Sequence, residues 1–137
     1  MRSVLLASVL ALAPIAAAQS SCGTLAITGS GAAGTTLDIG LTGATANAFA
    51  LVFVGENTGT TAIRLGPIRL DLGLATPFFP VPLGRTDANG DASQSFTVPN
   101  AVMQQYALNA QAATVTLSIF PFRFSGCTSN VVPFTIG

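Results

Sequence analysis

Apolar and polar residues alternate with a period of two along several short segments of this chain. Residues 36–41 place their leucine and isoleucine side chains on one face of an extended segment, and residues 68–72 repeat the pattern with Arg69 and Asp71 on the other face. Such alternation is typical of strands with one buried and one exposed face. Glycine and proline residues interrupt the pattern at short intervals. We therefore expect an all-β fold, an antiparallel β-sandwich of about eight short strands.

Residues 48–54 are apolar at every position. A strand of this kind is either covered on both faces or leaves one apolar face exposed. Because short apolar runs usually indicate burial, we expect a strand in the centre of the core.

The parity of the apolar positions changes between residues 115 and 124. Aliphatic side chains occupy odd positions up to Ile119, and phenylalanines occupy even positions from Phe120. A one-residue change of phase in a half-buried strand requires a bulge or a bend, which we expect at Phe120-Pro121. An alternating row of phenylalanines is more often core than binding surface, so we interpret this row as core.

Prolines mark two further segments. Pro80 and Pro82 stand two residues apart, so a strand that contains both lacks two N–H donors on the same side. We expect that strand to lie at the edge of a sheet, protected against pairing. Pro99 begins the one segment with helical character, residues 99–105, which allows one or two turns at most.

The first residues have the pattern of an export signal. Arg2 precedes an apolar run over residues 4–12, Pro14 interrupts it, and small residues at 16–18 form a cleavage site. We expect residues 1–18 to be removed, which leaves a single domain of residues 19–137. A retained membrane anchor is the alternative, but this apolar stretch is shorter than the roughly 20 residues of a spanning helix.

Cys22 and Cys127 are the two cysteines of the chain. In an oxidising exterior an isolated pair most simply forms one disulfide, which would tie the start of the domain to a point near its end. Lipid modification of Cys22 is the alternative. It is disfavoured because the preceding residues lack the expected apolar position and because cleavage after Ala18 is the better site.

Composition excludes several chemistries. Half of the residues are hydrophobic, 7% are charged, the formal net charge is zero and histidine is absent. Without histidine there is no Ser-His-Asp or Cys-His catalysis, and without lysine there is no Walker phosphate loop. Scattered arginines in a neutral chain are unlike a nucleic-acid-binding surface. We expect no enzymatic activity, no catalytic residues and no cofactor.

Asp87, Asn89 and Asp91 place oxygen-bearing side chains at alternating positions around a glycine. The spacing is similar to the start of a calcium-binding loop, but the bidentate Glu that such a loop requires is missing. Asp, Asn and Gly are also the residues of tight turns. We favour a hairpin turn between a strand that ends near Arg85 and one that begins near Ser93, with calcium binding as the alternative.

A series of strand ends and turns follows in order along the domain: residues 36–41, 48–52, 70–73, 86–90, 98–99, 106–107 and 128–137. In this order the chain resembles a family of small secreted β-sandwich domains from planctomycete-type environmental bacteria. The resemblance covers most of the chain after residue 18. It implies a β-sandwich fold and export, and it implies no catalytic residue.

These observations favour a non-enzymatic secreted structural protein, such as a self-associating subunit of a cell surface or an extracellular filament. A nearly uncharged apolar chain lacks the repulsion that keeps proteins apart, and an open strand edge could pair with another copy. The alternative is an extracellular module that binds carbohydrate, an envelope polymer or calcium. We expect no nucleic-acid partner, and no membrane association after removal of the signal.

Overall fold

The computed structural model describes residues 22–102 and 104–137. The export signal expected over residues 1–18 and its cleavage site lie outside the described residues. The described part contains nine strands and no helix, and so no helix there is long and apolar enough to cross a membrane. The strands are β1 (Thr24–Thr28), β2 (Thr36–Thr42), β3 (Phe49–Gly55), β4 (Thr58–Leu65), β5 (Ile68–Leu74), β6 (Phe78–Arg85), β7 (Ala92–Thr97), β8 (Tyr106–Ile119) and β9 (Phe122–Ile136).

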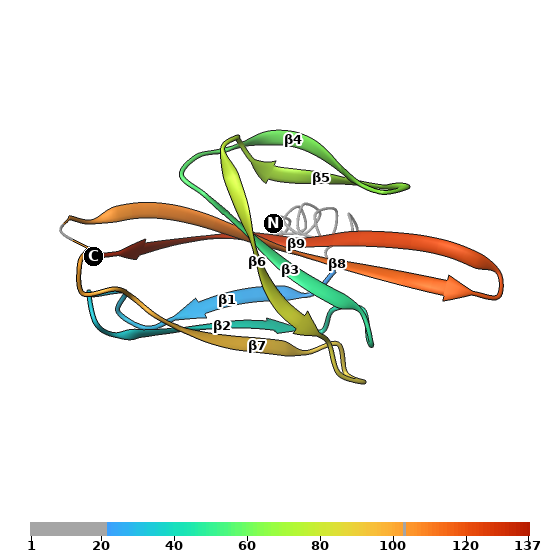
Figure 1. The fold of residues 1–137 in the computed structure, drawn as a ribbon, viewed down its shortest axis with the longest axis horizontal. Coiled ribbons are helices and arrows are strands. Elements are labelled where there is room, and N and C mark those ends of the chain that lie inside the picture. The colour runs from blue at the N-terminus through green and yellow to red at the C-terminus, as the bar shows by residue number, and fades with distance from the viewer. Residues whose placement is uncertain (1–21, 103) are drawn as a thin grey trace, which may run out of the picture.

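The strands form three antiparallel sheets that pack in layers (Figure 1). The central sheet has the order β6-β3-β8-β9. A sheet of order β1-β2-β7 covers one of its faces, and the β4–β5 hairpin covers part of the other. Every strand pair is antiparallel. The expected all-β class with antiparallel sheets is confirmed, with one strand more than the eight anticipated.

Strand β3 explains why residues 48–54 are apolar throughout. Ala50, Val52 and Val54 face the core shared with β1 and β2, whereas Leu51 and Phe53 face the core shared with β5. Because successive side chains of a strand point to opposite faces, a strand between two layers needs apolar residues at every position. The prediction of a strand covered on both faces is confirmed.

Two hydrophobic cores result, one on each face of the central sheet. The alternating patterns predicted for β2 and β5 supply them: Ile39 and Leu41 are buried in the first core, and Leu70 and Leu72 in the second. On the outer face of β5, Arg69 and Asp71 are exposed and form an ion pair of 3.2 Å. Strand β6, with Pro80 and Pro82, lies at the edge of the central sheet, as expected.

The predicted disulfide between Cys22 and Cys127 is confirmed, with a Cα–Cα distance of 5.5 Å. It joins the segment before β1 to β9, and the Cys22 N–H donates to the Thr128 carbonyl at 2.8 Å. Further along, the Asn130 side-chain amide accepts from the Leu25 N–H (2.8 Å) and donates to the Leu25 carbonyl (3.2 Å). These contacts fasten the edge strand β1 of the outer sheet to the edge strand β9 of the central sheet.

Three expectations for residues 99–105 and 115–124 are wrong. The chain reverses completely at Phe120-Pro121 instead of bending within one strand, so β8 and β9 form a long hairpin. The phenylalanine row is exposed, with relative accessibilities of 93% for Phe120, 70% for Phe122 and 38% for Phe124. The segment that begins at Pro99 is a turn over residues 99–102, closed by a bond from the Val102 N–H to the Pro99 carbonyl; this segment is too short to nucleate a helix.

Candidate functional site

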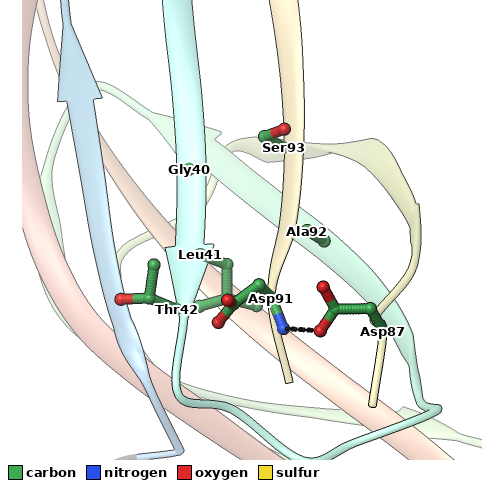
Figure 2. Close-up of a pocket in the computed structure, with 7 residues that line it drawn as sticks. All are labelled: Gly40, Leu41, Thr42, Asp87, Asp91, Ala92 and Ser93. Carbon is green, nitrogen blue, oxygen red and sulfur yellow. Dashed lines mark hydrogen bonds between the residues drawn. The ribbon is translucent and has the colours of Figure 1, made fainter. Parts of the chain in front are cut away.

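The connection from β6 to β7 contains the three residues singled out as a possible calcium site. Strand β6 ends at Arg85 and strand β7 begins at Ala92, close to the predicted bounds. It is not a hairpin, however, because β6 pairs with β3 and β7 pairs with β2 in the other sheet. The connection is a corner that carries the chain between two layers. A shallow hollow at this corner (Figure 2) is lined by Gly40, Leu41, Thr42, Asp87, Asp91, Ala92 and Ser93.

The Asp87 carboxylate organises the corner. Figure 2 shows it turned toward the Asp91 N–H, which donates to Oδ1 at 2.9 Å, and the Asn89 N–H donates to the same oxygen at 2.8 Å. These backbone donors, first Asp91 and then Asn89, stabilise the ionised carboxylate and lower the pKa of Asp87 below its ordinary value. The carboxylate thus holds the turn through its negative charge.

The corner is also fixed to the loop that follows β2. Asp91 Oδ1 accepts from the Gly43 N–H at 3.0 Å, and the Gly90 carbonyl accepts from the Ala44 N–H at 3.0 Å. Gly90 has a φ of 82°, and any side chain there would collide with the Ala44 carbonyl oxygen. The glycine at this position is therefore required both by the turn and by the close approach of the neighbouring loop.

The geometry gives Asp87 and Asp91 structural roles through one carboxylate oxygen each, while Asn89 is exposed. Over residues 22–102 and 104–137, His, Cys, Asp and Glu side chains form no group of three or more that could hold a metal ion. Calcium binding by Asp87, Asn89 and Asp91 stays a prediction, which is tested below.

Acidic side chains elsewhere have local partners or stand alone on the surface. Asp38 on β2 accepts a hydrogen bond from the Ser95 hydroxyl at 2.6 Å, and Asp71 pairs with Arg69. Glu56 follows β3 at the rim of a separate hollow lined by Phe78 and Phe79. These three carboxylates lie on β2, on β5 and after β3.

Five of the nine exposed large hydrophobic side chains in the described part of the chain lie at the end of the β8–β9 hairpin. Pairing between β8 and β3 ends at Val115 opposite Phe49, so the following residues form a two-stranded ribbon that extends beyond the other strands (Figure 1). Leu117 lies opposite Phe124 and Ile119 lies opposite Phe122. Directly opposed residues share a face of a β-ribbon, so these four side chains project to one side. We call these four, with Phe120 at the turn, the ribbon face.

The opposite side of the ribbon is polar. Thr116 lies opposite Ser125 with their hydroxyls hydrogen-bonded, and Ser118 lies opposite Arg123. The ribbon is therefore amphipathic, with its single charged residue on the polar side. Leu117 and Ile119 are exposed by 53% and 61%, and the Phe122 and Phe124 rings meet edge to face at 5.1 Å between centroids.

The ribbon face is exposed because the β4–β5 hairpin covers only the neighbouring part of β8 and β9. The β4–β5 hairpin packs on the same side of β8 and β9, and Val115 belongs to the core beneath it. The hairpin packs closely on Gly126, where an added Cβ would approach the Ile68 and Leu70 side chains to 2.7 and 2.8 Å. Beyond Gly126 the apolar side continues toward the turn, and its exposure rises from 38% at Phe124 to 93% at Phe120. The ribbon face is thus an uncovered extension of the second core.

Sequence reasoning missed this surface, although the parity change that it detected belongs to the turn. A two-residue turn places odd positions of β8 opposite even positions of β9, so the aliphatic and the phenylalanine rows share one face. The pattern shows which side is apolar, and only the tertiary structure shows that nothing covers it.

Comparison with protein-family models, with curated proteins and with solved structures gave no match to this chain. The resemblance to small secreted domains of planctomycete-type bacteria therefore stays a hypothesis.

Proposed function

We propose that this chain is a non-enzymatic secreted β-sandwich protein, of the kind suggested by its resemblance to small exported domains, that associates with other molecules of its kind at the cell surface or in the extracellular space. The observation that carries the proposal is the ribbon face: five large apolar side chains lie together on a ribbon that projects from the body. Contiguous exposed apolar surface of this size marks interaction sites in soluble proteins.

The charge of the chain supports the same proposal. Its formal net charge is zero and only 7% of its residues are charged, so long-range repulsion between copies is weak. The edge strand β6 carries Pro80 and Pro82, which disfavour strand pairing there. Association is thereby directed away from β6.

Export is part of the proposal. A disulfide between Cys22 and Cys127 is compatible with an oxidising compartment, where such bonds persist. If residues 1–18 are the signal, material recovered outside the cell should have the intact mass of a chain that begins at Gln19. An intact mass equal to the whole chain would contradict this part of the proposal.

Self-association is tested by sedimentation velocity on the exported, oxidised protein over a wide range of concentrations. We expect the average mass to rise above that of the monomer as the concentration increases. A protein that stays monomeric at the highest concentration would contradict the proposed function.

A further inference from the structure

We infer that the ribbon face is the contact between two copies of this chain, which meet ribbon to ribbon about a two-fold axis. The inference rests on the proposed function and names its surface, its partner and its stoichiometry. Leu117, Ile119, Phe120, Phe122 and Phe124 of one copy cover the same five side chains of the other.

The area of the ribbon face fits such a contact. The exposed parts of its three phenylalanines together equal about two whole aromatic side chains, roughly 300–500 Å². Leu117 and Ile119, each more than half exposed, add to this area. A standard interface buries about 800 Å² on each partner, of which somewhat more than half is apolar. The ribbon face therefore supplies the apolar part of one interface of ordinary size.

The backbone of the ribbon favours a protein partner over a lipid surface. Beyond Val115, β8 has lost its neighbour β3, and β9 is the last strand of its sheet. Residues 116–119 and 122–125 thus present N–H and C=O groups at both edges with no strand partner among the described residues. Hydrocarbon cannot satisfy these groups, whereas water at a protein interface or another strand can. Arg123, the single cation of the ribbon, is also too little to draw it to an anionic membrane.

A second copy is favoured over a different protein because the ribbon face is complementary to itself. It carries no charge, so two copies meet without repulsion, and each presents two aliphatic–phenylalanine pairs that can alternate across the contact. A head-to-tail contact would need another apolar surface for the ribbon to enter. Away from the ribbon, the exposed Phe49, Phe79, Phe96 and Tyr106 stand on four different strands, β3, β6, β7 and β8. The apolar hollow beside Phe96 has a volume of about 130 Å³, which is too small to receive the whole ribbon face.

The arrangement predicts a closed dimer. A contact between identical surfaces uses up both of them, so association stops at two copies, whereas a head-to-tail contact continues into longer assemblies. Higher assemblies would then need a second surface outside the ribbon.

The test compares the wild type with the double variant Ile119→Ser/Phe122→Ser by sedimentation velocity. The matched control is Phe79→Ser, which removes a similarly exposed side chain from β6. We expect a dimer for the wild type and the control, and a dimer dissociation constant at least about a hundredfold higher for the double variant. The absence of reactive thiols and an unchanged circular dichroism spectrum verify that each variant is folded. Ile119→Arg, which adds a charge at the contact, repeats the test with a single substitution.

The outcomes separate this inference from the proposed function. A wild type that forms open-ended assemblies, or a folded double variant or Ile119→Arg variant that still forms the wild-type dimer, overturns the ribbon contact and leaves self-association standing. A monomeric wild type overturns both, and binding of that monomer to phosphatidylcholine vesicles through Ile119 and Phe122 would assign the surface to lipid instead.

Discussion

A single carboxylate, that of Asp87, shapes the corner between the central sheet and the β1-β2-β7 sheet. Its Oδ1 accepts two backbone N–H bonds that only the ionised form receives at full strength, which explains its lowered pKa. The same residue is the first of the three proposed calcium ligands. The structural and the calcium interpretation predict different responses to substitution, to pH and to calcium.

The first prediction concerns pH. A carboxylate whose pKa is lowered in the folded state stabilises the fold above its unfolded pKa, and this contribution is lost as the pH falls through the lowered value. The wild type should therefore be more stable than Asp87→Asn at neutral pH. The difference should shrink as the pH falls below the ordinary value of 3.8 and vanish below the lowered pKa of the folded state. Urea unfolding at a series of pH values measures it. A difference that persists or grows in acid would contradict the role assigned to the carboxylate.

Calcium provides the control for this prediction. If Asp87 only shapes the corner, Asp87→Ala should lower the melting temperature equally with and without calcium. A ligand that binds only the folded state raises stability by mass action. A wild-type melting temperature that rises by several degrees in millimolar calcium, with no rise in Asp87→Ala, would establish a calcium site and favour the binding-module interpretation.

The second prediction concerns the stability of variants at two buried threonines. Thr86 Oγ1 accepts from the Ala48 N–H at 2.8 Å and donates to the Thr45 carbonyl at 2.7 Å, whereas Thr114 Oγ1 has no hydrogen-bond partner among the described residues. An unpartnered buried hydroxyl costs stability, and a satisfied one cannot be removed without leaving its partners unpaired. Thr114→Val should raise the free energy of unfolding by about 1 kcal/mol, and Thr86→Val should lower it by about 1–3 kcal/mol. Chemical denaturation that shows both variants destabilised alike would contradict the contrast.

At the scale of the elements, an irregularity in the β8–β9 hairpin joins the central sheet to the β4–β5 hairpin. The register shifts between Gln111 and Ala113, and Ser129 Oγ accepts the Ala112 N–H at 2.9 Å where the regular pairing is interrupted. The Gln111 amide accepts from the Gly73 N–H of β5 and donates to the Ser129 carbonyl, both at 2.8 Å. One buried side chain thus satisfies backbone groups in two layers.

Gln111→Leu is the third prediction. The substitution keeps an apolar body of similar size but leaves the Gly73 N–H and the Ser129 carbonyl without their partner, so the free energy of unfolding should fall by about 2–4 kcal/mol. Urea denaturation measures the loss. Asn109→Leu is the control and should cost much less, because Asn109 is half-buried and its hydrogen bond to the Glu56 carbonyl is exposed to water. Equal losses in the two variants would refute the bridging role of Gln111.

Local pattern was enough to predict those elements whose burial is decided within the strand. The alternation in β2 and β5, the continuous apolar run of β3 and the prolines of β6 each gave the correct environment. The local pattern does not show which strands pair with each other or how the sheets stack. The corner at Asp87 has the residues of a hairpin turn, yet the strands it connects belong to different sheets, because β6 pairs with β3 and β7 pairs with β2.

The ribbon also shows a limit of prediction from the local pattern. Its apolar face has the pattern of a buried strand face, and its exposure depends on another element, the β4–β5 hairpin, which packs on β8 and β9 at Val115 and Gly126. Position-by-position hydropathy contains no information on where a covering layer ends.

For the whole molecule, the disulfide between Cys22 and Cys127 closes the fold. It connects residues that are 105 positions apart, and together with Asn130 it holds β1 against β9. In the chain-entropy model a loop of about this length loses roughly 4.7 kcal/mol of unfolded-state freedom, an upper limit for the gain in stability.

The fourth prediction follows from this closure. Replacing Cys22 or Cys127 by serine should lower the free energy of unfolding by about 2–5 kcal/mol, and the wild type should contain no thiol reactive to alkylation without prior reduction. Urea unfolding with and without reductant measures the loss, and reductant should have no effect on the variants. Labelling of both cysteines in the native, unreduced protein would contradict the disulfide between them.

The central claim is that the ribbon face is where copies of this chain meet, and hydrogen exchange tests it most directly. Amide exchange of residues 116–119 and 122–125 is measured at a low and at a high protein concentration, with β7 as an internal reference at another sheet edge. Association through the ribbon predicts slower exchange of these residues at the high concentration and no change in β7. Ribbon amides that exchange at the same rate at both concentrations, while the average mass increases, would contradict the claim.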